Sequence, residues 1–322
     1  NKPPIITNEG LDKKFQVAEN RSFANYSFYL GTTNDNIEEI KKTSKRACGV
    51  KIFMGASTGN MLVDNIKSLE NIFLHCPKLI ATHCESSPII DKNFAAAKEK
   101  YGDDIPLELH TEIRSRECCI ESSTLAINLA RNYGSRLHVL HLTTKEEVDF
   151  FSNSTDVSGK SITAEVCIHH MLYSKKDYAK KKGFIKCNPS IKEESDRLAL
   201  IDGVINNNID VIATDHAPHL ISEKTGKYED IPAGLPVIQH SLRACLEFYH
   251  NGIFSLEQII EKICHNPAIC YNVKDRGFIR EGYWADLVIM EFLKIGEIDE
   301  MPMMHKCGWS AFSDVLFNVV TR

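Results

Sequence analysis

Several features that mark special classes of protein are absent from this sequence. No apolar run approaches the roughly 20 residues that a membrane-spanning helix needs, so we expect no membrane span. A net charge of -5 gives no broad attraction to nucleic acid or to an anionic membrane. The chain also lacks a basic patch interleaved with aromatic residues, the usual platform for nucleic acid. We therefore predict neither a nucleic-acid partner nor a membrane partner.

The cysteines do not form the pattern of a disulfide framework. The chain has eleven of them, an odd number, with no Cys-x-x-Cys, and the only neighbours are Cys118 and Cys119. Disulfide frameworks belong to short secreted chains, and this chain has 322 residues. We therefore expect reduced thiols, most of them small core residues, and a cytoplasmic location.

Short β-rich runs alternate with helical patterns along most of the chain. At 43% hydrophobic and 25% charged residues, the composition is that of a globular protein with an ample core. Strands that alternate with helices of 10–15 residues indicate βα units and a parallel sheet. The predicted strands are Tyr26–Leu30, Gly49–Met54, Leu79–His83, Leu137–His141, Ile162–Val166 and Ile209–Thr214. The predicted helices include Glu117–Asn132, Lys145–Ser152 and Glu193–Asn206.

Polar residues at the strand ends decide between two α/β architectures. Lys51 lies within a predicted strand, while His83, His141 and Asp215 each follow an apolar run directly. A (β/α)₈ barrel builds its catalytic face from such positions. A doubly wound sheet also places ligands at strand ends, but no Gly-x-Gly-x-x-Gly follows the first strand. The sequence therefore predicts an α/β fold of the TIM-type (β/α)₈ class over residues 1–272.

The pattern changes after residue 272. Gly277–Glu291 is predicted to form two short strands around a turn, and Asp314–Thr321 is also strand-like. We interpret residues 273–322 as part of a small β module that packs beside the barrel.

The densest group of ionisable residues is Asp215–His219, where Asp215, His216 and His219 lie within five residues. An aspartate at the end of a buried strand is costly unless it is paired, hydrogen-bonded or bound to a metal. Pro218 stiffens the segment. A functional site is one interpretation, and a capped loop with two exposed histidines is the other.

Two histidines are candidate metal ligands. His83 and His141 each follow a strand, and imidazole nitrogen is a common zinc ligand. A single strand-end histidine is more often a core or loop residue, but two of them with Asp215 at a third strand end favour a metal site. His138 is out of phase with His141 along its strand, which indicates an outer position.

Lys51 is the unusual member of this set, because it lies inside an apolar strand. A buried ammonium without a partner is expensive, so such a lysine shifts its pKa, takes a special role or extends to the barrel mouth. The chemical possibility is that a neutral lysine amine adds CO₂ and becomes an anionic carbamate able to bridge two metal ions.

At these residues the chain resembles the dihydroorotases, amidohydrolases related to hydantoinases and dihydropyrimidinases. The resemblance runs in family order across nearly the whole chain, over Tyr26–Gly31, Val50–Asp64, His83–Glu85, Arg114–Ala126, Leu137–Thr143, Thr163–His170, Lys186–Pro189, Ile212–His219, Pro232–Pro236, His265–Ala268 and Gly282–Val288.

The resemblance implies a zinc-dependent hydrolase of a cyclic amide. In such proteins a TIM-type barrel carries a small β-sandwich formed by both chain ends. Two zinc ions are bridged by a carboxylated lysine, here Lys51, and by a hydroxide. His83 and His141 would hold one zinc and Asp215 would contact the other. Asp215 would also accept the proton of the attacking hydroxide and return it to the leaving ring nitrogen.

The resemblance also implies a substrate and its contacts. Dihydroorotate would be hydrolysed reversibly to N-carbamoyl-aspartate in pyrimidine biosynthesis. Asn188 and His219 would bind the ring and its carboxylate, and Pro232, Ala233 and Gly234 would offer backbone groups to the ring. Asn188 and Gly234 are equally residues that turns favour. The resemblance also suggests a homodimer.

One departure from the family pattern concerns the start of the chain. The family opens with a His-x-His pair and a substrate-binding arginine, and neither is present. We therefore expect that the first barrel strands are missing, and that a chain complete as given would have an incomplete metal site and little activity. Unpaired sheet edges would also disfavour independent folding.

Two other functions remain open. A hydantoinase or dihydropyrimidinase would share the lysine, the histidines and the aspartate, and the features favouring dihydroorotase are residues 55–64, Asn188 and His219. A non-catalytic scaffold relative typically loses metal ligands, whereas Lys51, His83, His141 and Asp215 are all present.

Overall fold

Six parallel strands form the centre of the protein. The computed structural model describes residues 3–55, 61–292, 303–312 and 319–321. Neighbouring strands pair in parallel and in sequence order, from β1 to β6. The strands are β1 (Tyr29–Gly31), β2 (Gly49–Phe53), β3 (Ile80–His83), β4 (Leu137–Val139), β5 (Ile162–Cys167) and β6 (Val211–Ala213). Each overlaps a strand predicted from the sequence.

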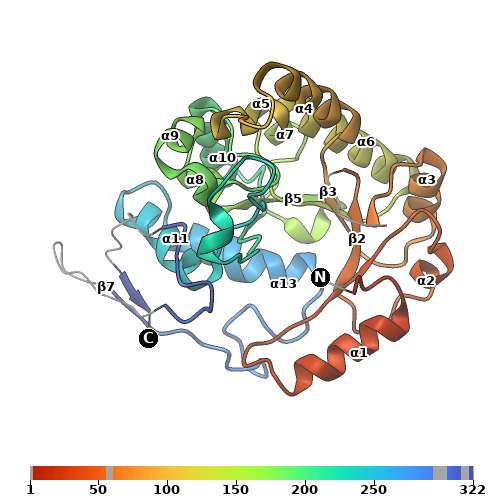
Figure 1. Ribbon diagram of the computed structural model, residues 1–322. Helices are drawn as coiled ribbons and strands as arrows, with labels where there is room; N and C mark the ends of the chain where they lie inside the picture. The colour runs from red at the N-terminus through yellow and green to blue at the C-terminus, as the bar shows by residue number, and fades with distance from the viewer. Residues whose placement is uncertain (1–2, 56–60, 293–302, 313–318, 322) are drawn as a thin grey trace.

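Helices follow the strands and lie around the outside of the sheet (Figure 1). They are α1 (Asn8–Glu19), α2 (Ile37–Lys41), α3 (Ile66–His75), α4 (Ser87–Tyr101), α5 (His110–Ile113), α6 (Arg116–Tyr133), α7 (Lys145–Val148), α8 (Ile168–Leu172), α9 (Tyr178–Lys181), α10 (Glu194–Ile205), α11 (Ser241–His250), α12 (Leu256–Ile260) and α13 (Asn266–Cys270). The alternation of strand and helix confirms the predicted TIM-type class.

The two faces of β2 differ in a way that positions the site. Val50 and Ile52 are fully buried and join the main hydrophobic core, to which α3 and α6 also contribute. Lys51 and Phe53 alternate with them and stay partly accessible. Since successive side chains of a strand point to opposite faces, the outer face packs on the helices. The other face carries Lys51.

The described residues contain no helix that is long and apolar enough to cross a membrane. All eleven cysteines lie in the described part of the chain and are free thiols. Eight of them are buried, as the sequence predicted for core residues.

The β module is only partly as predicted. Within Gly277–Glu291 we expected two strands around a turn, and this expectation is wrong. The segment is irregular until β7 (Met290–Phe292), which pairs antiparallel with β8 (Val319–Thr321). Gly277 and Gly282 both have a φ of 82°, so the chain turns at two points where a continuous hairpin strand would be extended. The division at residue 272 stays a prediction.

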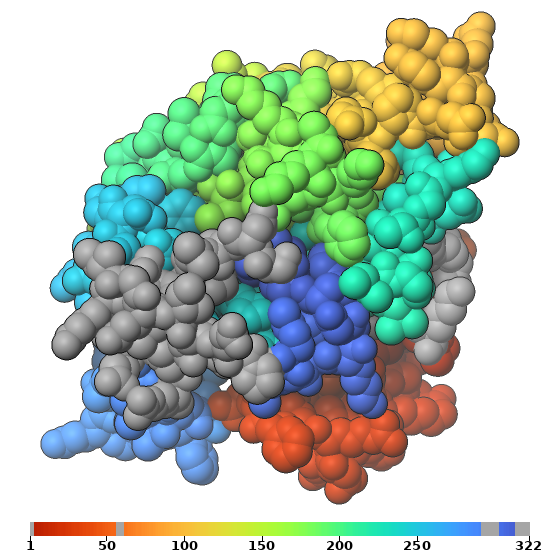
Figure 2. Space-filling model, turned by 60° about the vertical axis from the view of Figure 1, so that its left-hand side comes forward, coloured from red at the N-terminus to blue at the C-terminus, as the bar shows by residue number. Residues whose placement is uncertain are grey.

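Residues 303–312 dock on the barrel loops. In Figure 2 this dark blue segment lies between green and teal surface segments and the red N-terminal region. The Trp309 indole N–H donates to the carbonyl of His219 at 2.8 Å, and the Tyr173 hydroxyl donates to the carbonyl of Ala311 at 2.6 Å. A segment distant in sequence therefore supports the loop that follows β6.

Candidate active site

The predicted metal ligands lie at one edge of the sheet. Phe53 of β2 is paired with His83, which ends β3, and His141 and Asp215 each follow a strand by two residues. His141 has a φ of 40° and Asp215 a φ of 42°. Residues other than glycine rarely adopt such values, and backbone strain of this kind concentrates at functional sites. Two of the four predicted ligands therefore have an unusual backbone conformation.

His83 and His141 face each other through ring nitrogens. Nδ1 of His83 lies 3.0 Å from Nε2 of His141. Nε2 of His83 lies 2.8 Å from the Glu85 carboxylate, which suits a donated hydrogen bond and leaves the lone pair on Nδ1. Two nitrogens on one tetrahedral zinc ion are about 3.3 Å apart, given bonds of about 2.0–2.1 Å. The two rings therefore fit a shared cation after a small movement.

Glu85 and Arg114 are site residues that the sequence reasoning missed. Glu85 is fully buried and forms an ion pair with the Arg114 guanidinium. Burial alone would raise the pKa of Glu85, but Arg114 and the hydrogen bond from His83 lower this pKa to about 2. Glu85 is thus an anion that fixes the ring of His83. Its place two residues after a strand-end histidine was the available signal.

Lys51 combines a lowered pKa with an ammonium group that has no hydrogen-bond partner among the described residues. Burial lowers its pKa to about 8, against the opposing effect of the Asp215 and Glu165 carboxylates. Its ammonium lies 4.6 Å from the centre of the Phe53 ring, and among the described residues no hydrogen bond or ion pair involves it. Burial also lowers the pKa of both His83 and His141, and the charge of Lys51 adds to that effect.

Asp215 is enclosed by protein and still reachable by solvent. The residue is exposed to solvent on one side, but many protein atoms surround its carboxyl group. This surrounding protein raises the pKa of Asp215 to about 6. Lys51 lowers this pKa and Glu165 raises it further, so the carboxylate shares an electrostatic environment with both residues. No hydrogen bond to Asp215 is found in the described ranges. An accessible carboxyl group with a pKa near neutrality suits proton transfer.

Glu165 is a second acidic residue that sequence reasoning missed. It lies on β5, and its carboxylate is 3.1 Å from Nε2 of His138. The other ring nitrogen of His138 lies 2.7 Å from the Thr163 hydroxyl. His138 is therefore engaged by β5 and not by the facing pair of His83 and His141. Thr163, Glu165 and Cys167 alternate along β5, which was the signal in the sequence.

Of the predicted substrate residues, Gly234 packs against the segment after β6, which contains His219. The Asn188 side-chain oxygen is buried and has no hydrogen-bond partner in the described part of the chain. Gly234 has a φ of 140°, and a Cβ there would lie 2.5 Å from the carbonyl oxygen of Ala217 and 3.1 Å from the His219 ring. Pro232 and Ala233 precede it in the same turn. The structure thus places this turn directly against the segment that begins at Asp215.

Comparison with known proteins identifies the family. The family model described as "Amidohydrolase family" matches residues 31–309. The chain belongs to the amidohydrolase family. It is 27% identical to a dihydroorotase of Methanosarcina acetivorans, over 96% of this chain and 68% of that protein. It is 29% identical to a dihydroorotase of Pyrococcus abyssi, over 97% of this chain and 67% of that protein.

Solved structures confirm the fold of this amidohydrolase. The L-hydantoinase of Arthrobacter aurescens superposes with a TM-score of 0.89 at 23% identity, over 98% of this chain and 72% of that one. A dihydroorotase of Saccharomyces cerevisiae in complex with 5-fluoroorotic acid gives a TM-score of 0.63 at 20% identity, over 85% and 75%. Such likenesses show the barrel fold alone.

The amidohydrolase offers further buried side chains of metal-binding type near this site. Cys167, His169 and His170 form one group, in which the ligand atoms lie within 4.8 Å of one another. Both ring nitrogens of His169 lack partners among the described residues. Glu85, Cys118 and Cys119 form a second group. The sequence analysis singled out none of these as ligands.

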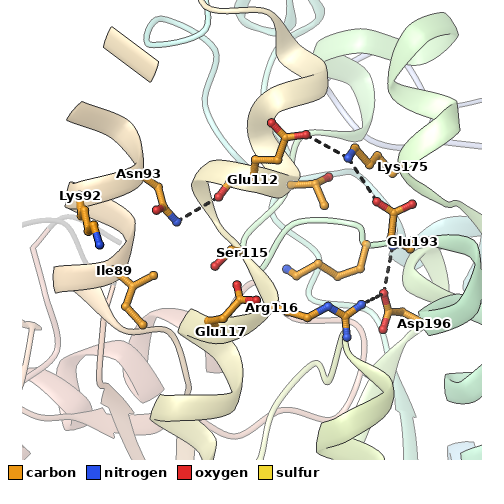
Figure 3. A pocket seen from close by; sticks show the side chains of 12 residues that line it. Ile89, Lys92, Asn93, Glu112, Ser115, Arg116, Glu117, Lys175, Glu193 and Asp196 are labelled. Carbon is orange, nitrogen blue, oxygen red and sulfur yellow. Dashed lines mark hydrogen bonds and ion pairs between the residues drawn. The ribbon is translucent and has the colours of Figure 1, made fainter. Parts of the chain in front are cut away.

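The amidohydrolase also has a cavity of about 570 Å³ away from its predicted ligands (Figure 3). It lies between α4, α5, the start of α6 and the start of α10, and Lys51, His83, His141 and Asp215 are absent from its lining. Lys175 pairs with Glu112 at 3.0 Å and with Glu193 at 3.2 Å, and Arg116 pairs with Asp196 at 2.6 Å. These charges satisfy one another within the protein.

Proposed function

We propose that this amidohydrolase is a zinc-dependent dihydroorotase that hydrolyses dihydroorotate reversibly to N-carbamoyl-aspartate in pyrimidine biosynthesis in the cytoplasm. As a member of its family it is a hydrolase, and the dihydroorotase names of its relatives suggest the substrate. The observation that carries the proposal is the facing pair of His83 and His141, with Lys51 on the neighbouring strand and Asp215 two residues after β6. The homodimer stays a prediction.

The four donors supply part of the coordination of two zinc ions. His83 and His141 would hold one ion, a carboxylated Lys51 would bridge both, and Asp215 would contact the other. Bound there, the ions lower the pKa of water towards neutrality and polarise the ring carbonyl. Glu85, held by Arg114, keeps Nδ1 of His83 free to act as a ligand.

Asp215 is the proposed proton carrier. Its carboxylate would accept a proton from the attacking water and return it to the ring nitrogen that leaves. In the metal-free protein burial raises the pKa of this carboxyl to about 6, and its accessible position suits proton transfer. Its surface accessibility lets a substrate reach it.

The surroundings of the proposed substrate residues favour an anionic ring. Asn188 and His219 would contact the ring and its carboxylate, with Pro232, Ala233 and Gly234 beside them. The buried side chains of Lys186 and Lys224 lie behind this turn without a carboxylate partner in the described residues. Dihydroorotate carries a carboxylate that dihydrouracil lacks, so this excess of positive charge supports dihydroorotate.

A hydantoinase or dihydropyrimidinase is the second candidate. The hydantoinase of Arthrobacter aurescens shares the barrel fold with a TM-score of 0.89 and the yeast dihydroorotase with 0.63, so the fold leaves both activities open. The predicted metal ligands do not distinguish the two activities, so the substrate must be tested directly.

The test measures zinc per chain and turnover of dihydroorotate, dihydrouracil and hydantoin by the purified full-length protein. About two zinc ions per chain with turnover of dihydroorotate alone is the expected result. Zinc with turnover of only dihydrouracil or hydantoin would replace dihydroorotase with the second candidate. A protein with neither zinc nor turnover would be a non-catalytic scaffold.

A further inference from the structure

The turn Ile231–Gly234, called the proline turn below, is built against the segment that follows β6. The Ala217 N–H donates to the carbonyl of Leu235 at 3.0 Å, and Gly234 is in close contact with Ala217 and His219. Asp215 is only two residues before Ala217. The position of the proline turn therefore sets one wall of the space beside Asp215.

The buried ammonium of Lys224 binds two carbonyls of this turn. The Lys224 side chain is almost fully buried, with 1% of its residue surface exposed. Its Nζ donates to the carbonyls of Pro232 at 2.7 Å, Gly234 at 3.0 Å and Lys186 at 3.3 Å. An ammonium has three donors, so these three carbonyls use all of them. No carboxylate among the described residues forms an ion pair with Lys224.

Lys186 completes the arrangement from the other side of the turn. Its Nζ donates to the carbonyl of Ile231 at 2.7 Å and to that of Tyr228. Its backbone carbonyl accepts the N–H of Gly234 at 2.9 Å as well as the Lys224 ammonium. The carbonyls of Ile231, Pro232 and Gly234 are thus all bound to lysine ammonium groups.

One backbone N–H of the proline turn has no hydrogen-bond acceptor among the described residues. Pro232 has no N–H, the Gly234 N–H is bound to Lys186, and the Ala233 N–H has no acceptor in the described part of the chain. Peptide units whose carbonyls face a cation have polarised N–H groups, which are better donors. Ala233 therefore offers a fixed donor in the turn that packs against Ala217, two residues after Asp215.

We propose that Lys224 is a positioning residue, which holds the proline turn so that the Ala233 N–H donates to an acceptor oxygen of the ring substrate. This inference rests on the proposed ring hydrolysis and assigns to Lys224 a role in substrate binding, not in the chemical step. The pKa of Lys224, lowered by burial to about 8, leaves the group mostly charged at neutral pH.

The chain supplies a matched control in Lys262. This lysine is also 1% exposed, and burial lowers its pKa to about 8 as well. Its Nζ donates to the carbonyl of Ile209 at 2.7 Å and to the Asn207 side chain at 3.0 Å. It holds the loop before β6, at the end of the strand opposite to Asp215.

The experiment compares Lys224→Met with Lys262→Met in the full-length enzyme. For Lys224→Met we expect the KM for dihydroorotate to rise at least about tenfold, with kcat within about threefold and zinc content unchanged. The substitution should displace the Ala233 N–H that binds the substrate and leave the groups that carry out the chemical step in place. For Lys262→Met we expect a lower melting temperature and an unchanged KM. Equal KM values in Lys224→Met and the wild type would overturn the proposal, as would an equal rise in both variants.

A second measurement keeps the proposal testable if Lys224→Met does not fold. Lys224→Gln retains a shorter, neutral donor, and hydrogen exchange of the peptide spanning residues 231–235 should be faster in this variant than in the wild type. N-carbamoyl-aspartate should slow that exchange in the wild type more than in the variant. Unchanged exchange would overturn the role of Lys224 even if the wild type turns over dihydroorotate. Failure of the wild type to turn over any ring, with the exchange difference intact, would overturn the proposed function alone.

Discussion

The site at the strand ends and the cavity of Figure 3 differ in how their charged groups are satisfied. In the cavity, Lys175 and Arg116 are neutralised by neighbouring carboxylates. At the strand ends, Lys51 and Asp215 have no hydrogen bond within the described residues, and His141 Nδ1 is buried without a partner. Unpaired polar groups are costly in a folded protein.

The difference indicates that polar groups without protein partners identify this site better than the volume of a cavity does. The cavity holds about 570 Å³, and its Lys175 and Arg116 are ion-paired. In its lining the Ser115 hydroxyl is buried without a partner among the described residues, but no charged group there resembles the unpaired Lys51. At the strand ends, polar groups without partners lower the stability of the folded protein, and a bound metal ion or substrate would offset that loss. Three substitutions and one titration test this contrast.

The largest effect is expected for Asp215→Asn. Loss of the proton carrier should lower kcat for dihydroorotate by about 10²–10⁴-fold, while the protein stays folded. The matched change in the cavity is Asp196→Asn, which removes a buried partner of Arg116. We expect Asp196→Asn to lower the melting temperature and to leave kcat within about threefold, as measured by steady-state kinetics and thermal unfolding. Equal losses of kcat would erase the distinction between the two regions.

Lys51→Met should separate metal content from stability. Without the carbamate, zinc per chain should fall below two and activity should fall with it. The fold should be at least as stable, because the substitution removes a partly buried ammonium that has no hydrogen bond or ion pair among the described residues. Metal analysis and urea unfolding measure the two effects. Full zinc occupancy in Lys51→Met would show that Lys51 is not a bridging ligand.

Glu85→Gln should have a smaller effect that is confined to the metal. The amide still reaches His83 but no longer holds a negative charge beside it, so zinc affinity should fall about 10–100-fold. Competition with a chelator measures this directly. Glu147→Gln is the control, because Glu147 is equally buried but is bound to the Thr144 hydroxyl at 2.9 Å. A zinc affinity unchanged by Glu85→Gln would remove Glu85 from the site.

The sequence predicted the parallel strands because their apolar runs are short and regularly spaced. The carboxyl ends of parallel strands lie at the same edge of the sheet however the side chains pack. The positions of Lys51 within a strand and of His83, His141 and Asp215 at or just after strand ends were therefore predictable. The ion pair of Glu85 with Arg114 was not, because it joins residues 29 positions apart on different elements.

The error at Gly277–Glu291 has a physical cause. Before β7, apolar residues of that segment such as Trp284 and Ile289 are largely exposed and pair with no strand among the described residues. An alternating pattern indicates a strand only where a partner and a core are available, which depends on residues far away in the chain.

The smallest effect concerns the pH dependence of stability in the metal-free protein. Burial raises the pKa of Asp215 to about 6, whereas an unfolded aspartate has a pKa of about 3.9. Between about pH 4 and pH 6 the folded state thus holds a proton that the unfolded chain has released, so this group's contribution to stability is lost as the pH rises. His83 and His141, whose pKa values are lowered, act in the opposite direction.

Because the histidines oppose Asp215, the quantity to measure is the difference in urea midpoint between the wild type and Asp215→Asn. This difference isolates the carboxyl group, since the histidines are common to both proteins. It should decrease, relative to its value near pH 4, as the pH approaches 6.5. A difference in urea midpoint that does not change with pH would mean that Asp215 is as well solvated as the paired carboxylates at the rim of the cavity. The contrast between the two regions would then not extend to Asp215.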